Sequence, residues 1–163
     1  FVDVALGVGQ LQALMRFVSI ALDRPELPGI SARSIIIGTA PGETHVFGAS
    51  MAAEFFRRAG WDVETALAGG PETLARAVAA RPVDVVGIAL NSRDSEPALT
   101  ETIATLRARS VNRRMLVILG GGVPVEDPAV LLRVGADATL AALQFAPGRA
   151  GQLVARRGMQ PDV

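Results

Sequence analysis

The sequence predicts an α/β fold in which helices cover both faces of a doubly wound, five-stranded parallel sheet. The first observation is that short apolar runs rich in Val and Ile alternate with segments of helical periodicity, five times along the chain. The second is that these runs lack polar alternation, which is typical of parallel strands buried on both faces. Regular alternation of strand and helix favours a parallel sheet. The length of 163 residues, 50% of them hydrophobic, suits one core of this kind.

An N-terminal helical segment precedes the sheet in this prediction. Residues 1–23 carry apolar side chains at spacings of three and four, which indicates one or two helices. Residues 24–29 contain two prolines and a glycine, and are therefore a linker. The chain thus divides into a helical segment with its linker (1–29), an α/β domain (30–157) and a tail (158–163). Because the chain begins with Phe1 and not with Met, we expect other domains of the same chain.

The first half of the α/β domain has clear boundaries. Residues 35–38 read Ile-Ile-Ile-Gly, which is the run expected of a buried strand. Gly60 stands at the C-cap of the helix that follows, and Pro71 stands in the first turn of the next helix. The elements expected here are strand 35–38, helix 45–59, strand 61–67, helix 71–80 and strand 83–90.

The second half is less regular. Three glycines end the fourth strand, and Pro147 and Gly148 weaken the start of the last helix. The elements expected here are helix 97–108, strand 115–119, a short helix 128–134, strand 138–140 and helix 145–156.

Five strands joined by short helices suggest the flavodoxin-like strand order 2-1-3-4-5. In such sheets ligands bind beyond the carboxyl ends of the strands, near the switch point between strands 1 and 3. Functional residues are therefore expected in three loops, at 39–45, 89–95 and 120–127.

Charge and composition restrict the classes of partner. Lys plus Arg and Asp plus Glu number 16 each, so there is no general attraction to nucleic acid or to anionic membranes. There is no Cys, which excludes disulfides and thiolate metal sites. No apolar run is long enough to span a bilayer. We expect a cytoplasmic domain that contacts neither membrane nor nucleic acid directly.

His45 is the only histidine, and it falls in the first of the three loops. Imidazole binds transition metals through one ring nitrogen, and Glu43 is placed to accept the proton of the other nitrogen. Gly48, one turn further on, would let a bulky planar ligand approach the backbone. The alternative is a surface or helix-capping imidazole without a ligand.

Three glycines, Gly120, Gly121 and Gly122, follow the fourth strand. They leave the backbone bare and conformationally free, as a sharp turn or the wall of a slot requires. They lack the Lys-Ser/Thr of a P-loop.

Together these residues resemble the motif of cobalamin-binding domains. Residues 43–48 resemble Asp-x-His-x-x-Gly, with Glu43 in place of Asp. Ala89-Leu90-Asn91 stands where the family has Ser-x-Leu, and Gly120-Gly121 stands where it has Gly-Gly. Forty residues separate Gly48 from Ala89, and twenty-eight separate Asn91 from Gly120, both close to the family's intervals.

This resemblance implies a cobalamin-binding type of α/β domain in which the His ligates the metal. The nucleotide tail of the ligand would then lie in a slot lined by the glycines. Ala89 lacks the hydroxyl that would meet the tail base, and Ser92 is three residues late. The site residues expected from the motif and its surroundings are Glu43, His45, Gly48, Ser92, Gly120, Gly121 and Gly122, with His45 as the metal ligand.

A narrower resemblance extends over residues 40–45, 55–63 and 109–113. They look like the antirepressors of photosynthetic bacteria, the AppA- and PpaA/AerR-type regulators. In AppA-type proteins this domain is called SCHIC, a sensor containing haem instead of cobalamin, which acts on a PpsR-type repressor. The resemblance implies a regulatory sensor domain that binds haem, or cobalamin, near His45 and contacts such a repressor.

Two alternatives stay open. One is a corrinoid-carrying domain of a cobalamin-dependent photoreceptor or methyltransferase. The other is a ligand-free interaction domain, with the slot filled by Leu90, Asn91 and Val123. An enzyme is not expected. A Ser-His-Asp triad would require a second histidine besides His45, and the chain has none. No pair of carboxylates lies in a context that suits acid–base catalysis.

Overall fold

The computed structural model describes residues 33–67, 69–140 and 142–159. The predicted N-terminal helices, the linker and residues 160–163 of the tail lie outside the described residues. The described part forms a five-stranded, all-parallel sheet of order β2-β1-β3-β4-β5. The predicted flavodoxin-like, doubly wound fold and its strand order are therefore confirmed.

The strands are short, and the three central ones, β1, β3 and β4, correspond to apolar runs of the sequence, whereas the edge strand β2 is mostly polar and exposed. Residues in register across the centre of the sheet include Ile37, Gly87 and Ile118. The strands are β1 (Ser34–Thr39), β2 (Asp62–Ala66), β3 (Val85–Ala89), β4 (Leu116–Gly120) and β5 (Ala138–Thr139).

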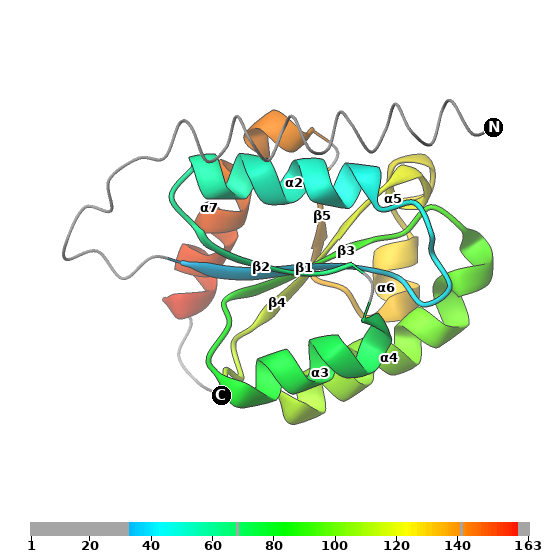
Figure 1. The fold of residues 1–163 in the computed structure, drawn as a ribbon, viewed down its shortest axis with the longest axis horizontal. Helices are drawn as coiled ribbons and strands as arrows, with labels where there is room; N and C mark the ends of the chain where they lie inside the picture. The colour runs from blue at the N-terminus through cyan, green and yellow to red at the C-terminus, as the bar shows by residue number, and fades with distance from the viewer. Residues whose placement is uncertain (1–32, 68, 141, 160–163) are drawn as a thin grey trace.

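Helices cover both faces of the sheet, as Figure 1 shows with the sheet seen edge-on. Helices α2 (Phe47–Arg58) and α7 (Ala146–Gly158) lie on one face. Helices α3 (Gly70–Ala80) and α4 (Glu96–Arg109) lie on the other face. The remaining helical segments are η1 (Arg93–Ser95), α5 (Gly122–Glu126), α6 (Val130–Val134) and η2 (Leu143–Phe145).

Two differences from the sequence prediction bear on the loops of the predicted site. The helix expected to begin at His45 begins at Phe47, so His45 belongs to the loop before α2. The expected loop 120–127 contains a short helix, α5, that begins at Gly122. Glycine is a poor helix former, so helix propensity does not predict this helix. Pro124 lies in its first turn, where a missing N–H costs nothing.

The sheet separates two hydrophobic cores of different character. Alternate strand residues such as Ile36, Val86 and Val117 face α3 and α4, where large side chains such as Leu99 and Leu106 fill the space. The opposite residues face α2 and α7, which contribute mainly small side chains: Ala49, Ala52, Ala53, Ala146 and Ala150.

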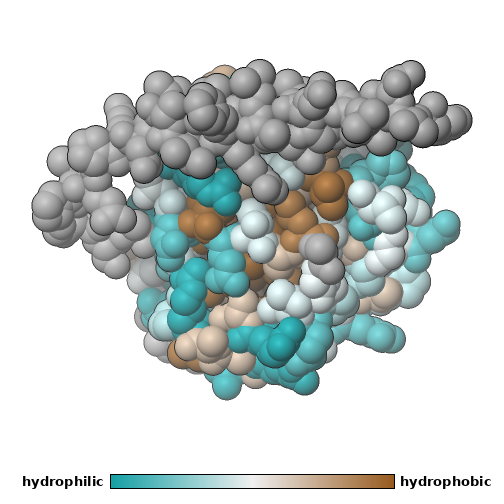
Figure 2. Space-filling view, in the orientation of Figure 1, coloured by the Kyte–Doolittle hydropathy of each residue, from teal (hydrophilic) through white to brown (hydrophobic). Residues whose placement is uncertain are grey.

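The outer surface near α2 is partly apolar. Figure 2 shows brown, hydrophobic patches at the level of α2, set among teal, hydrophilic areas. On α2 itself Phe56 is buried and belongs to the core, whereas Phe55 is half-buried. Within the described part of the chain, no helix has the length and apolar character that crossing a membrane requires.

Candidate functional site

The carboxyl ends of β1, β3 and β4 meet at one edge of the sheet. β1 lies between β2 and β3, so the chain switches direction beside it. The loops that follow these strands hold the three predicted groups: Glu43 with His45, Asn91, and the glycine triplet. Ligands of doubly wound sheets bind at such a switch point.

Glu43 joins two of these loops through three hydrogen bonds. Its Oε1 accepts the backbone N–H of His45 at 2.9 Å and contacts the ring Nδ1 of His45 at 2.6 Å. Its Oε2 accepts the backbone N–H of Asn91 at 3.0 Å. The side chain of Glu43 is only 3% exposed, whereas that of His45 is 81% exposed. The carboxylate is therefore an interior anchor, and the imidazole projects from it into the open.

These contacts fix the protonation pattern of the site. Burial by itself raises the pKa of Glu43, but the hydrogen bonds from His45 and Asn91 outweigh it and hold the pKa below its usual value. An ionised Glu43 facing Nδ1 keeps the ring proton on that nitrogen. Nε2 is then the nitrogen that can bind a metal, with Glu43 orienting the ring behind it.

The second and third loops are tied together in the same way. The side-chain Oδ1 of Asn91 accepts the N–H of Gly122 at 3.0 Å. The carbonyl of Gly120 accepts the N–H of Leu90 at 2.8 Å, and the carbonyl of Leu90 accepts the N–H of Val123 at 3.3 Å. Through Glu43 and Asn91, the three loops form one connected edge.

Gly121 makes this close approach of loops feasible. Its φ is +104°, in a region that other residues rarely adopt. A Cβ added there would collide with the backbone carbonyl of Leu90. Glycine is therefore required at this position for two independent reasons.

A cavity of about 510 Å³ lies between the sheet and the helices α2 and α7, and reaches the loop that carries His45. This volume is in the range of small-molecule sites. Its walls come from β1, β3 and β4, from α2, and from η2 with the start of α7. The lining residues include Ile35, Ile37, His45, Phe47, Gly48, Ala49, Ala52, Phe56, Gly87, Ala89, Asn91, Ile118, Gly120, Gly121, Leu140, Leu143 and Ala146.

Four of the seven predicted site residues line this cavity: His45, Gly48, Gly120 and Gly121. Glu43 supports it from behind by its contact with His45. Ser92 and Gly122 are not among the lining residues. The hydroxyl of Ser92 accepts the N–H of Asp94 at 3.3 Å, and Gly122 donates its N–H to Asn91.

Two residues expected to fill the slot do not do so. Leu90 and Val123 are buried in the core on the α3 and α4 side of the sheet. Only Asn91 of that group lines the cavity.

Most of the wall was not foreseen from the sequence. The strand residues of the wall, such as Ile35, Ile37 and Ile118, lie at every second position and face α2 and α7. The small residues Ala49 and Ala52 on α2 are the one sequence signal that could have pointed to space beneath this helix.

The open space meets the backbone at two glycines. A Cβ added at Gly48 or at Gly120 would have nothing within 4 Å. Both residues line the cavity, so both leave room that a ligand can occupy. This bare wall beside a projecting imidazole fits a planar macrocycle with an attached tail.

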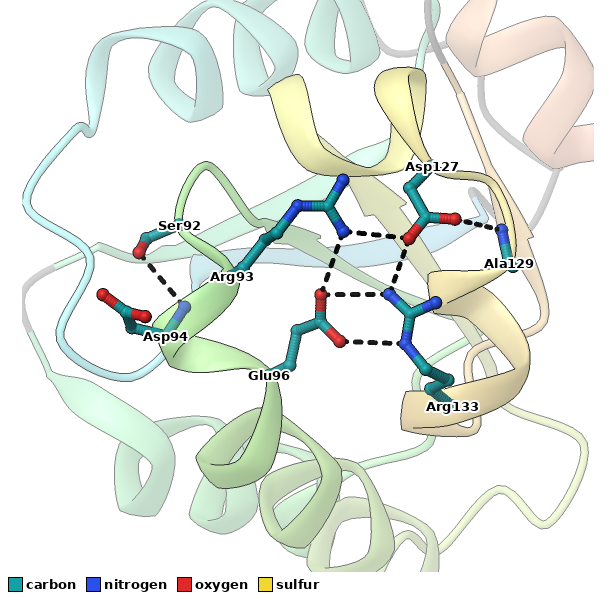
Figure 3. Close-up of polar contacts among 7 residues, drawn as sticks. All are labelled: Ser92, Arg93, Asp94, Glu96, Asp127, Ala129 and Arg133. Atoms are coloured by element: carbon teal, nitrogen blue, oxygen red, sulfur yellow. Dashed lines mark hydrogen bonds and ion pairs between the residues drawn. The ribbon is translucent and has the colours of Figure 1, made fainter.

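A network of charges holds the neighbouring loops in place (Figure 3). Asp127 Oδ2 lies 2.9 Å from a guanidinium nitrogen of Arg93 and 2.9 Å from one of Arg133. Arg133 also makes a two-pronged contact with Glu96 at 3.0 and 3.1 Å. Hydrogen bonds from Arg93, which has the largest effect, and from Arg133 lower the pKa of Asp127 to about 2. The network fastens the start of α4 to the α5–α6 junction.

The described residues contain no group of three or more His, Asp or Glu side chains arranged to hold a metal ion. A lone exposed imidazole such as that of His45 suits a metal that is already held in a macrocycle.

Comparison with known proteins agrees with this geometry. Residues 33–142 match the family described as B12 binding domain. An uncharacterized 20.5 kDa protein in the bchF-crtJ intergenic region of Rhodobacter capsulatus is 27% identical over 137 residues, which are 84% of this chain and 71% of that protein.

Two solved structures share the fold. A cobalamin-binding protein from Desulfitobacterium hafniense DCB-2 has a TM-score of 0.70 at 21% identity, over 90% of this chain and 70% of that one. The monomethylamine corrinoid protein of Methanosarcina barkeri has a TM-score of 0.63 at 19% identity, over 76% of this chain and 58% of that one. The family match covers well over half of the chain and includes all five strands, so the chain belongs to the B12 binding domain family.

Proposed function

We propose that this domain is a regulatory binding module that holds a corrinoid, with His45 at the metal and the nucleotide tail in the cavity beside it. The proposal rests mainly on the observation that the imidazole and the glycines line the same cavity. One cavity of about 510 Å³ is lined both by the only imidazole of the chain and by Gly120 and Gly121 at the end of β4. A bound corrinoid would supply a cobalt centre that can exchange ligands, and a sensor domain could transmit such an exchange.

The protein's own residues would prepare this site. Glu43 holds the imidazole by Nδ1 and so presents Nε2 outward. Gly48 and Gly120 keep the wall bare. The apolar residues of α2 and the start of α7 would give the inner cavity a hydrophobic wall.

Haem is the other ligand that the sequence resemblance implies. Haem would use the same imidazole, but it has no nucleotide tail and would leave the inner cavity empty. For this reason we place cobalamin first and keep haem as the competing ligand in the experiment.

The ligand test is an absorbance titration with hydroxocobalamin and, separately, with hemin. We expect the wild-type domain to bind cobalamin with a spectral change, and His45→Ala to lose that change. Ser92→Ala is the control, because Ser92 neighbours the site without lining the cavity. A shift with hemin alone that is lost in His45→Ala would establish haem instead. Binding of neither ligand would refute the proposal.

The regulatory part of the proposal is that the domain contacts a PpsR-type repressor, without catalysis of its own, in the cytoplasm. It is supported by the sequence likeness to antirepressors over residues 40–45, 55–63 and 109–113. In a gel-shift assay, we expect the domain to release such a repressor from its operator DNA and to bind no DNA itself. An unchanged repressor–DNA complex, with no co-elution of domain and repressor, would contradict this part alone.

A further inference from the structure

We infer that the inner cavity selects the base of the corrinoid tail, and that it favours an apolar benzimidazole over a purine such as adenine. This inference rests on the proposed function, since it requires that the tail enters the cavity. It goes further by naming the chemistry of the part that would be buried there.

The side chains of the cavity divide sharply by polarity. Among its described lining residues, only His45 and Asn91 have polar side-chain atoms. Both belong to loops at the carboxyl edge of the sheet, at the mouth. Deeper positions, such as Ile35 at the start of β1 and Phe56 near the end of α2, are apolar and 1–3% exposed. Phe56 packs against Trp61 edge-to-face, with ring centroids 5.0 Å apart, which helps to close that end.

The backbone peptide groups of the strands in the cavity wall already have hydrogen-bond partners. β3 pairs with β1 on one side and β4 on the other, so its peptide groups are used in the two ladders. At the strand ends, the carbonyl of Ala89 accepts the N–H of Ala40 at 2.9 Å, and that of Gly120 accepts the N–H of Leu90 at 2.8 Å. The deep cavity therefore offers a ligand shape and apolar contact, with few hydrogen-bonding groups.

Ala89 is the residue on which this preference for the base chiefly depends. It lines the cavity, lies at the end of β3 and pairs with Gly120 on β4. A methyl group at this point contributes surface and no hydrogen bond. A base buried against it keeps its polar atoms unpaired, which is unfavourable.

The two kinds of base differ in how many polar atoms they would bury. A benzimidazole has one ring nitrogen beyond its link to the ribose. Adenine has three such ring nitrogens and an exocyclic amino group. We expect the cavity to bind cobalamin at least about tenfold more tightly than its adenine-bearing analogue, because each unpaired polar group adds a cost.

The experiment measures dissociation constants for three ligands by calorimetry: cobalamin, the adenine-bearing analogue, and cobinamide, which has no base. We expect cobalamin to bind most tightly and both others at least about tenfold more weakly. If none of the three binds, the proposed function fails. If cobalamin binds and the adenine analogue binds equally well, the inference fails and the proposed function stands. Cobinamide binding as tightly as cobalamin would also overturn the inference, since the tail would then lie elsewhere.

A pair of variants assigns the effect to the cavity. Ala89→Ser adds a hydroxyl to the wall, and we expect the preference for cobalamin over the adenine analogue to narrow to about threefold or less. Ala104→Ser makes the same change on the exposed surface of α4 and should leave the preference unchanged. Thermal melting would check that both variants fold. An undiminished preference in a folded Ala89→Ser would overturn the inference.

Discussion

Glu43 contacts both the imidazole of His45 and the loop after β3, which a shorter side chain would not reach together. Its carboxylate is almost fully enclosed, yet each oxygen has a partner: Oε1 faces His45, and Oε2 accepts the N–H of Asn91. The extra methylene of Glu, relative to the Asp of the cobalamin-binding motif, lets one oxygen reach the β3 loop while the other stays on the imidazole. The residue that orients the ring therefore also fixes the neighbouring loop.

The change Glu43→Gln tests this double role. The amide keeps an acceptor for only one of its two partners and directs an N–H2 group at the other, so the ring or the β3 loop loses its support. We expect cobalamin to bind about tenfold more weakly, as is usual when the partner of a metal-binding His is altered. Calorimetry would measure the dissociation constant, with Glu126→Gln on the exposed surface of α5 as the control. Equal affinity of the two variants would contradict the assigned role.

Neighbouring glycines of the triplet have opposite roles, and a matched pair of alanine variants separates them. Gly121→Ala forces a Cβ into the carbonyl of Leu90 at a φ of +104°, so we expect a loss of about 1–3 kcal/mol or more in the free energy of unfolding. At Gly120 the Cβ would enter open cavity space, so stability should change by less than about 0.5 kcal/mol while cobalamin affinity falls.

Urea denaturation gives the stability of both glycine variants, and calorimetry gives their affinity for cobalamin. Equal stabilities would refute the role of Gly121 in the loop. Unchanged cobalamin affinity in Gly120→Ala would show that the ligand does not use this part of the wall.

At the scale of elements, the sequence predicted each strand and the long helices because their signals are local. The run Ile35-Ile36-Ile37 and the C-terminal Gly60 define β1 and the end of α2 without any tertiary information. The sequence pattern predicts the start of α2 two residues too early, because the periodicity of the helix includes His45 while its helical backbone begins at Phe47. The sequence pattern does not predict helix α5, because the helix begins with a glycine and its five residues are too few to show a hydrophobic periodicity.

The candidate site was predictable only in its loops. His45 and Gly48, and the first two glycines of the triplet, follow from two short motifs, each of which is contiguous in sequence. The cavity does not, because it depends on which alternate strand residues face the small side chains of α2, across elements far apart in the chain. The contact of Asn91 with both Glu43 and Gly122 likewise requires knowing that three loops meet.

The charge network between α4 and α6 gives a pH-dependent prediction at this scale. Asp127 has a pKa lowered from 3.8 to about 2 in the folded protein by Arg93 and Arg133. A lowered pKa stabilises the fold at pH values above 3.8, and this stabilisation is lost as the pH falls towards 2. We therefore expect Asp127→Asn to be less stable than wild type at pH 7, by a difference that shrinks between pH 4 and pH 2.

Chemical denaturation of both proteins at several pH values would measure this difference. Glu101→Gln, on the exposed surface of α4 and outside the network, is the control for a general effect of removing a negative charge. A difference that persists unchanged at pH 2 would show that Asp127 stabilises the fold by something other than its charge.

At the scale of the whole molecule, the two faces of the sheet are packed unequally. The α3 and α4 face is filled by large aliphatic side chains, whereas small side chains on α2 and α7 leave the cavity on the other face. Cavities weaken a fold, because the atoms that line them lack contacts on one side. The α2 and α7 face is thus the part of the molecule that a ligand can stabilise most.

This asymmetry leads to a prediction about the ligand and stability. A ligand that binds only the folded state, at a hundred times its dissociation constant, raises the free energy of unfolding by about 2.7 kcal/mol. For a domain of this size, that corresponds to a rise in melting temperature of about 5–10 °C. Differential scanning calorimetry with saturating cobalamin would measure the rise. Hydrogen exchange would locate it, and we expect the gain in protection beyond the global effect on α2 and α7 and not on α3. Protection gained equally on α3 would mean that the ligand does not fill the cavity, even if the melting temperature rises.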